Sequence, residues 1–356
     1  MKKLTLGIRF AIPAIAVMFL TAGSSLFADG GPNHRVRNLN YGVSGGNVND
    51  ISRRFCCSGT LGSLVRDTLG VQYILSNNHV LGLAGNATVG DDVSQPGRID
   101  NNCQIATVVA DFTVAPALSS GVDCAIAQLR PGLMNSTGAI EDIGTISSVV
   151  KLPTVGLSVA KSGRTTGFTT GTISSINTTV SVKYPNSCGA NNGPTFTFTN
   201  QVVINSTTFS AGGDSGSLIV SNNQCHQPVA LLFAGSSTAT IGNPISLVLT
   251  RLSASLGRTV SFVGGTCSAS VNSAVSDSGP SDSAVEFATA VMRGKEKGLM
   301  SRAGVIGVGV SASENSVDEA TIIVYVDVTA AAYPKLPKRI NGVKVQRVFT
   351  EPFVAY

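Results

Sequence analysis

Tryptophan is absent from this sequence of 356 residues, and charged residues make up only 13% of it. Lysine and arginine form no long run, and the formal net charge is +5. Because nucleic-acid-binding proteins carry dense basic patches, this composition argues against a nucleic-acid partner. Glycine is frequent, at 39 residues, and Ser, Thr, Val and Asn crowd the middle of the chain. Such usage favours many short strands and turns over long helices.

Histidine is scarce as well, with only His34, His79 and His226 in the chain. No two histidines are close in sequence, and neither H-E-x-x-H nor C-x-x-C occurs. The adjacent Cys56 and Cys57 are poorly spaced for a zinc site. The sequence therefore predicts neither a metal nor a cofactor.

The first residues have the pattern of a secretory signal. Lys2 and Lys3 precede an apolar run from Phe10 to Leu20, and small residues lead to a cleavage site near Ala28. The run is short for a transmembrane helix. We expect residues 1–28 to be a signal peptide, with no membrane span after its removal and a secreted or periplasmic protein.

Export changes what the seven cysteines mean. In an oxidising compartment some of them are expected to form disulfides. Seven is an odd number, so at least one is free or pairs between chains. The spacing leaves the connectivity open.

The composition and hydrophobic pattern of the chain change along its length. Residues 29–51 are polar and rich in Gly and Asn, and we expect a loose N-terminal lead-in. From 52 to 267, short apolar runs alternate with turn clusters, which predicts an all-β barrel or sandwich. The Ser-rich residues 268–282 resemble a linker. Residues 283–356 predict a small α+β domain, with a helix over 283–302 packed on a three-stranded sheet.

A candidate nucleophile lies in the segment SAGGDSGSLIV, which runs from Ser210 to Val220. Glycines around Ser215 permit a tight turn that exposes its hydroxyl. The backbone N–H groups of Gly213 and Ser215 could then stabilise the oxyanion that forms during acyl transfer. A Gly-rich β-turn without catalytic function explains the motif equally simply when it is taken alone.

A serine hydroxyl needs a base, and His79 is the best placed histidine, at the end of the apolar run VQYILS. His34 lies in the lead-in, and His226 lies in the polar turn SNNQCHQ, where we expect it to face solvent. The acid that orients the base is predicted to be Asp123, directly before the apolar run CAIAQL, because a carboxylate at a buried edge needs a partner. Asp111 is the competing candidate, in a more alternating run that fits an exposed position.

Three segments resemble the trypsin-like (chymotrypsin-fold) serine protease family of the bacterial secreted type. SNNHVL, VDCAIAQL and GGDSGSLIV are similar, in that order, to its histidine turn, aspartate strand and nucleophile loop. The resemblance covers about residues 52–265. It implies two six-stranded antiparallel β-barrels, followed here by the small α+β unit, with His79, Asp123 and Ser215 as a catalytic triad in the cleft between the barrels.

The same resemblance implies where substrate binds. Phe209 falls at the floor of the first substrate pocket, and Phe233, Ala234 and Gly235 fall on its wall. The stretches 206–213, 232–235 and 242–245 contain no Asp or Glu, so we expect small or apolar residues rather than Lys or Arg before the cut bond, with an acidic residue as the weaker possibility. The implied partner is a protein or peptide; the sequence leaves the oligomeric state open.

Two functions remain as alternatives. The first is a secreted endopeptidase that acts through an acyl-enzyme. The second is a catalytically silent trypsin-like module for binding or adhesion. An α/β-hydrolase is disfavoured, because Ser217 occupies the last glycine position of G-x-S-x-G and only His226 follows Ser215.

Overall fold

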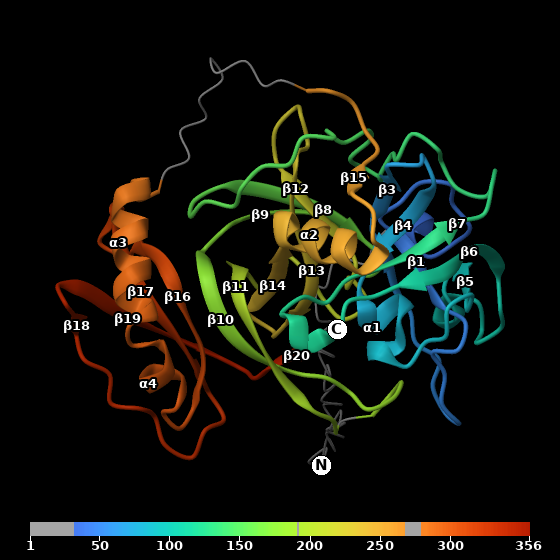
Figure 1. The fold of residues 1–356 in the computed structure, drawn as a ribbon. Helices are drawn as coiled ribbons and strands as arrows, with labels where there is room; N and C mark the ends of the chain where they lie inside the picture. The colour runs from blue at the N-terminus through green and yellow to red at the C-terminus, as the bar shows by residue number, and fades with distance from the viewer. Residues whose placement is uncertain (1–31, 191, 268–278) are drawn as a thin grey trace, which may run out of the picture.

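The computed structural model describes residues 32–190, 192–267 and 279–356. Two β-barrels lie side by side, and a helix-and-sheet unit flanks the second barrel (Figure 1). The expected signal peptide, 1–28, and the part of the expected linker at 268–278 lie outside the described residues. Within the described ranges, no helix is long and apolar enough to span a bilayer.

The first barrel closes on itself because one strand belongs to both ends of its sheet. Strands β2 (Gly59–Leu61) and β3 (Ser63–Asp67) are separated only by Gly62; β2 pairs with β1, and β3 pairs with β4. Counting them as one gives an antiparallel ring of six strands. The other members are β1 (Val43–Asn47), β4 (Gln72–Ser76), β5 (Asp92–Gln95), β6 (Thr107–Val114) and β7 (Ala125–Leu129).

The expected lead-in needs correction, because β1 is a fully buried strand of the first barrel. Its sequence, VSGGN, lacks the apolar alternation that marks a strand. His34 is also buried, and its Nε2 atom lies 2.9 Å from Asp142 Oδ2. The barrel therefore begins before residue 52.

The second barrel closes in the same way. Strands β9 (Gly167–Thr172) and β10 (Ser175–Lys183) are separated by two residues; β9 pairs with β8, and β10 pairs with β11. They count as one strand in a second antiparallel ring of six. The ring is completed by β8 (Ser158–Gly163), β11 (Thr195–Asn205), β12 (Leu218–Ser221), β13 (Pro228–Gly235) and β14 (Ala239–Pro244).

Strand β11 joins two apolar runs that the pattern separates, 195–199 and 201–204. Asn200 lies between them with a φ of 63°, a left-handed conformation that Asn tolerates, so the alternation breaks without ending the strand.

Helix α2 (Ile245–Leu256) connects the two barrels. Its buried side chains, Ile245, Val248 and Leu252, lie in one apolar cluster with first-barrel residues and with Leu231 of β13. The next strand, β15 (Val260–Phe262), pairs with β3. A four-residue helix, α1 (Asn78–Leu81), follows β4, and short 3-10 helices occur at Pro32–His34, Leu83–Gly85, Arg98–Asp100 and Leu118–Ser120.

The C-terminal unit contains helix and sheet as expected, but two helices are present where a single helix over 283–302 was predicted. Asp282, which the sequence places in the linker, begins the first helix, and Gly294 follows its end. Packed on these helices is a sheet in which β16 and β17 are antiparallel and β17 and β19 are parallel. The elements are α3 (Asp282–Arg293), α4 (Glu296–Met300), β16 (Val305–Ser313), β17 (Ser316–Asp327), β18 (Arg339–Ile340) and β19 (Val343–Thr350).

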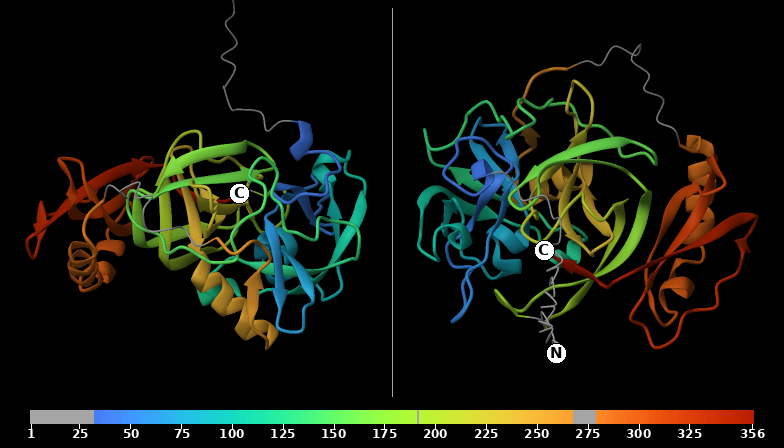
Figure 2. Two further views of the ribbon diagram at one scale, coloured as in Figure 1. Left: turned by 90° about the horizontal axis from the view of Figure 1, so that it is seen from above. Right: turned by 180° about the vertical axis from the view of Figure 1, so that it is seen from behind.

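This unit shares its sheet with the second barrel, because β16 pairs antiparallel with β10. The last strand, β20 (Phe353–Ala355), leaves the unit and lies against β10 and β13. Figure 2 shows this segment crossing from the unit to the middle of the molecule. The expectation of two six-stranded antiparallel barrels and a small α+β unit is confirmed.

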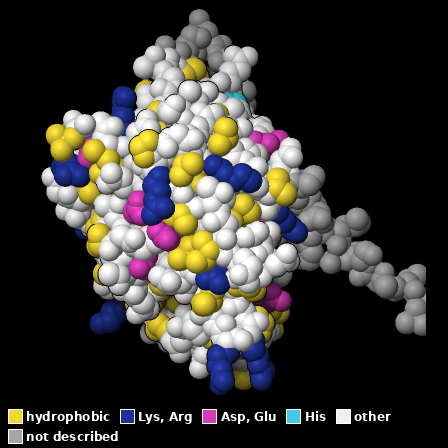
Figure 3. All heavy atoms as spheres, turned by 90° about the vertical axis from the view of Figure 1, so that its right-hand side faces the viewer, with side chains coloured by type: hydrophobic (Ala, Val, Ile, Leu, Met, Phe, Trp, Pro, Cys, Tyr) yellow, Lys and Arg dark blue, Asp and Glu magenta, His cyan; other side chains and the backbone are white. Residues whose placement is uncertain are grey.

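The face of the first barrel carries no large patch of one charge. Figure 3 shows Lys, Arg, Asp and Glu side chains scattered there among apolar and neutral ones.

Candidate active site

His79 lies on α1, directly after the first barrel's β4. Asparagine side chains fix this turn: Asn77 Nδ2 donates to the Asp123 carbonyl oxygen at 2.7 Å, and Asn78 Nδ2 donates to the Pro116 carbonyl oxygen at 2.9 Å. The backbone of the histidine turn is thereby held to the chain segment that precedes β7.

Asp123 is completely buried and accepts hydrogen bonds at both carboxylate oxygens. Its Oδ2 atom lies 2.6 Å from His79 Nδ1, and its Oδ1 atom accepts from the His79 backbone N–H at 3.2 Å. The hydroxyl of Tyr184, just after β10, also donates to Oδ2 at 2.7 Å. Three donors therefore hold the carboxylate in a fixed orientation toward the imidazole.

Asp111, the competing candidate, lies elsewhere. Its carboxylate pairs with Arg130 at 2.6 Å, and both side chains are more than one-third exposed. The structure therefore brings Asp123, and not Asp111, to His79.

Ser215 lies on a turn before β12 and has no exposed surface. Its Oγ atom donates to the Phe233 carbonyl oxygen at 3.2 Å. Gly213 has a φ of 97°, and a Cβ atom there would lie 2.5 Å from Thr165 Oγ1, so the turn requires glycine at this position. No hydrogen bond joins Ser215 to His79 among the described residues.

The turn that carries Ser215, the nucleophile turn, is held in place by Asp214, which is buried beside Lys161 of β8. The Asp214 carboxylate accepts from Thr166 Oγ1 at 2.7 Å and lies 3.6 Å from Lys161 Nζ. Burial lowers the pKa of Lys161, and the charge of Asp214 opposes that change. The sequence analysis missed Lys161; a lone lysine in the apolar run SVAKSG is the signal that could have revealed it.

The residues predicted for the first pocket belong to the second barrel, but Phe209 lies in a different apolar cluster from Phe233 and Ala234, and none of the four lines the cavity between the barrels. Phe209 is buried, and the ring of Phe233 packs against Phe198 in the barrel core with a centroid separation of 4.8 Å. Phe233 thus presents its carbonyl oxygen, rather than its ring, to Ser215. Ala234 and Gly235 form main-chain pairs with β20.

Tyr356, which follows β20, lies next to the candidate triad. Its carbonyl oxygen is 2.9 Å from His79 Nε2, and its N–H donates to the Phe233 carbonyl oxygen at 3.4 Å. The pKa of His79 is raised: burial lowers it, but the charge and hydrogen bond of Asp123 and the hydrogen bond to Tyr356 raise it more. The motifs contain no signal for Tyr184 or Tyr356, because each reaches the site through a long-range contact.

A cavity of about 720 Å³ opens beside these residues between the two barrels, lined in part by Asp50, His79, Tyr184, Gly213 and Tyr356. Burial raises the pKa of Asp50 to about 6, and the charge of His79 opposes that rise. A second hollow of about 560 Å³, near Pro153 and Leu247, contains none of the candidate catalytic residues.

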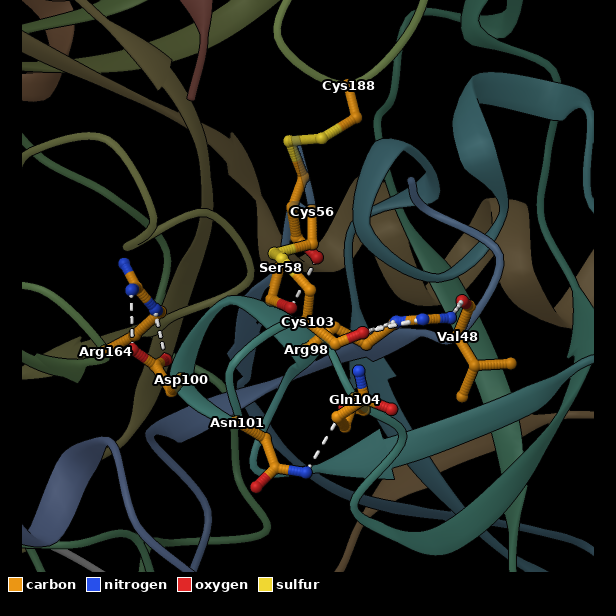
Figure 4. Close-up of a disulfide and its surroundings, with 11 residues drawn as sticks. Val48, Cys56, Ser58, Arg98, Asp100, Asn101, Cys103, Gln104, Arg164 and Cys188 are labelled. Atoms are coloured by element: carbon orange, nitrogen blue, oxygen red, sulfur yellow. Dashed lines mark hydrogen bonds and ion pairs between the residues drawn. A yellow bond between two sulfur atoms is a disulfide. The ribbon is translucent and has the colours of Figure 1, made fainter. Parts of the chain in front are cut away.

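Covalent and ionic links join the two walls of the cleft. A disulfide connects Cys57 of the first barrel to Cys188 of the second. Arg164, between β8 and β9, makes a bidentate ion pair with Asp100 of the first barrel, at 2.6 and 2.7 Å (Figure 4). The walls are thus tied on the side of the cleft next to the nucleophile turn.

The remaining cysteines account for the odd count. Cys56 pairs with Cys103 and Cys225 with Cys267, while Cys124 is free and buried directly after Asp123. Three disulfides and one free thiol are therefore present in the described structure.

No protein-family model matches the chain, and no curated protein matches it. Among solved structures, the chain is similar to a glutamic acid specific serine protease described as using a histidine triad in substrate binding, with 21% identity and a TM-score of 0.42 over 62% of this chain and 98% of that one. It is similar to protease A of Thermobifida fusca, with 20% identity and a TM-score of 0.41 over 64% and 99% of the two chains. A chymotrypsin of Cellulomonas bogoriensis matches with 18% identity and a TM-score of 0.41 over the same shares.

Proposed function

We propose that this protein is a secreted serine endopeptidase. The observation that carries the proposal is the 2.6 Å contact between His79 Nδ1 and the buried Asp123, at a cleft whose opposite wall holds Ser215 on a tight turn. The chain has the trypsin-like two-barrel fold by its own strand order. In this fold the two walls can supply a base and a nucleophile to one peptide bond.

In the proposed reaction, Ser215 Oγ attacks the carbonyl carbon of the substrate while His79 Nε2 takes the hydroxyl proton. Asp123 holds the imidazole with Nδ1–H toward the carboxylate and stabilises the imidazolium that forms. The negative charge on the tetrahedral intermediate is accepted by the backbone N–H groups of Gly213 and Ser215.

Collapse of the intermediate breaks the carbon–nitrogen bond, and His79 returns its proton to the leaving amine. The acyl group then remains on Ser215 until a water molecule, deprotonated by His79, releases it as a carboxylic acid. Ser215 Oγ must first turn from the Phe233 carbonyl toward His79 Nε2.

Export is part of the proposal. Three disulfides are favoured by an oxidising compartment and are uncommon in the cytosol. They agree with the N-terminal signal pattern.

A fluorophosphonate probe tests the proposal against a catalytically silent module. We expect covalent labelling at Ser215, and we expect Ser215→Ala to abolish labelling and to lower casein hydrolysis by about six orders of magnitude without loss of the fold. Ser217→Ala, two residues away, is the matched control and should still label. Labelling that persists in Ser215→Ala, or its absence from every folded variant, contradicts the proposed mechanism.

A further inference from the structure

Strand β20 occupies the side of the cleft formed by the second barrel. Val354 and Ala355 pair antiparallel with Gly235 and Ala234 of β13, and Phe353 pairs parallel with Val182 of β10. An added strand on an open edge is one of the ways in which proteins bind an extended peptide, because main-chain hydrogen bonds supply affinity without a sequence requirement. Here the added strand comes from the same chain.

The side chain of Tyr356 enters the first pocket. Its hydroxyl donates to the Ser236 carbonyl oxygen at 2.9 Å, and its ring packs against the apolar cluster that contains Phe209. Gly235 makes room for this ring, since a Cβ atom at that position would lie 2.2 Å from the Tyr356 hydroxyl oxygen.

The candidate catalytic groups are both engaged in this arrangement. His79 faces the Asp123 carboxylate through Nδ1 and the Tyr356 carbonyl through Nε2. A carboxylate and a backbone carbonyl are both acceptors, so this pair of contacts is satisfied when both ring nitrogens carry protons, and an imidazole in that form cannot act as a base. Ser215 is completely buried.

The segment is anchored on the second barrel before it reaches the cleft. The Thr350 hydroxyl lies 2.6 Å from Ser236 Oγ and 2.9 Å from Thr238 Oγ1. Phe353 is buried, with its ring 5.8 Å from that of Tyr325 in β17. Because β16 also pairs with β10, the whole unit is fixed beside the cleft, and an attached ligand of this kind has a high effective concentration.

We propose that residues Phe353–Tyr356 are an intramolecular ligand that occupies the second-barrel side of the substrate cleft, and that the pocket filled by Tyr356 selects an aromatic residue on the acyl side of the cut bond. The inference rests on the proposed function for its catalytic consequence. It assigns the C-terminal unit a regulatory role, and it narrows the substrate class to peptides in which an aromatic side chain precedes the cleaved bond.

The test compares the full chain with Tyr356→Ala, which keeps Phe353 and its core contacts. Burial of an aromatic side chain corresponds to about a 10- to 100-fold change in occupancy, so Ser215 should react with the fluorophosphonate about 10- to 100-fold faster in Tyr356→Ala. Tyr333→Ala is the control: this tyrosine lies in the same unit, is 49% exposed and packs against Phe349. If Ser215 does label, and labels at equal rates in all three proteins, the inference is overturned.

A binding experiment separates this inference from the proposed function. The fluorescent acetylated tetrapeptide Phe-Val-Ala-Tyr should bind Tyr356→Ala in the Ser215→Ala background, and it should bind the Ser215→Ala single variant at least tenfold more weakly. Replacing its tyrosine by lysine should abolish binding. If Ser215 never labels but these binding differences are found, the proposal that Phe353–Tyr356 is a cleft ligand is supported and the peptidase proposal is contradicted. If the peptide binds both proteins equally, or binds neither at millimolar concentration, the proposal of a cleft ligand is overturned.

Discussion

The first barrel presents His79 and Asp123 already hydrogen-bonded to each other, whereas the second barrel presents a buried Ser215 whose hydroxyl shares the Phe233 carbonyl oxygen with the Tyr356 N–H. Both carboxylate oxygens of Asp123 already accept hydrogen bonds from the protein. The second wall has an open main-chain edge at β13, and β20 fills it. The histidine and aspartate are thus preorganised by fixed hydrogen bonds, one of them from Tyr184 of the second barrel, while the state of the β13 edge depends on which peptide lies along it.

The largest expected effect is a loss of catalytic rate when the contact between His79 and Asp123 is altered. Asp123→Asn should lower kcat/KM by about four orders of magnitude, because an amide favours the wrong imidazole tautomer. Asp111→Asn is the matched control, since Asp111 pairs with Arg130 away from the site and its loss should change the rate little. Steady-state hydrolysis of one peptide by both variants checks this, and equal losses would contradict the assignment of Asp123.

The next effect concerns what holds the second wall in place. Lys161→Met leaves the buried Asp214 without its cation, which should lower the free energy of unfolding by about 3–5 kcal/mol. Lys297→Met, at an exposed position of α4, should change the free energy of unfolding by no more than about 0.5 kcal/mol. Urea unfolding of the two variants measures the difference. Equal stability would mean that the hydrogen bonds to Asp214 suffice without Lys161.

The smallest effect concerns the link between the two walls. Burial lowers the pKa of His79, but Asp123, the hydrogen bond to the Tyr356 carbonyl and the charge of Asp50 together raise it by more. Tyr184 donates to the Asp123 carboxylate. Because docking of Tyr356 requires a protonated Nε2, docking takes up a proton; it is favoured below the raised pKa and weakens as the pH rises through it.

The ratio of labelling rates, Tyr356→Ala over the full chain, should therefore grow as the pH falls. Measuring both rates across the neutral range, with Tyr333→Ala as reference, checks the direction. A ratio that stays constant or grows with pH would contradict the linkage.

Sequence reasoning predicted the local backbone where the signal is local, with His79 in a turn after a strand and Ser215 on a tight turn. SNNHVL and GGDSGS each fit within one turn, and the residues of the turn determine its shape. It failed where a strand is defined by its partners: β1, with the sequence VSGGN, is recognisable only through its pairing with β2 and β5. The pairing of Phe353 with Val182 joins residues far apart in the chain, and no periodicity encodes it.

The continuous sheet between the barrel and the C-terminal unit has a consequence for solubility. Strand β16 covers the main-chain N–H and C=O groups of β10 between Ser175 and Val180. A chain cut off before α3 would expose this row beside the apolar side chains of Ile176 and Val180. An uncovered edge of that kind is a template for a strand from another molecule. We therefore expect the C-terminal unit also to protect the second barrel from edge-to-edge aggregation.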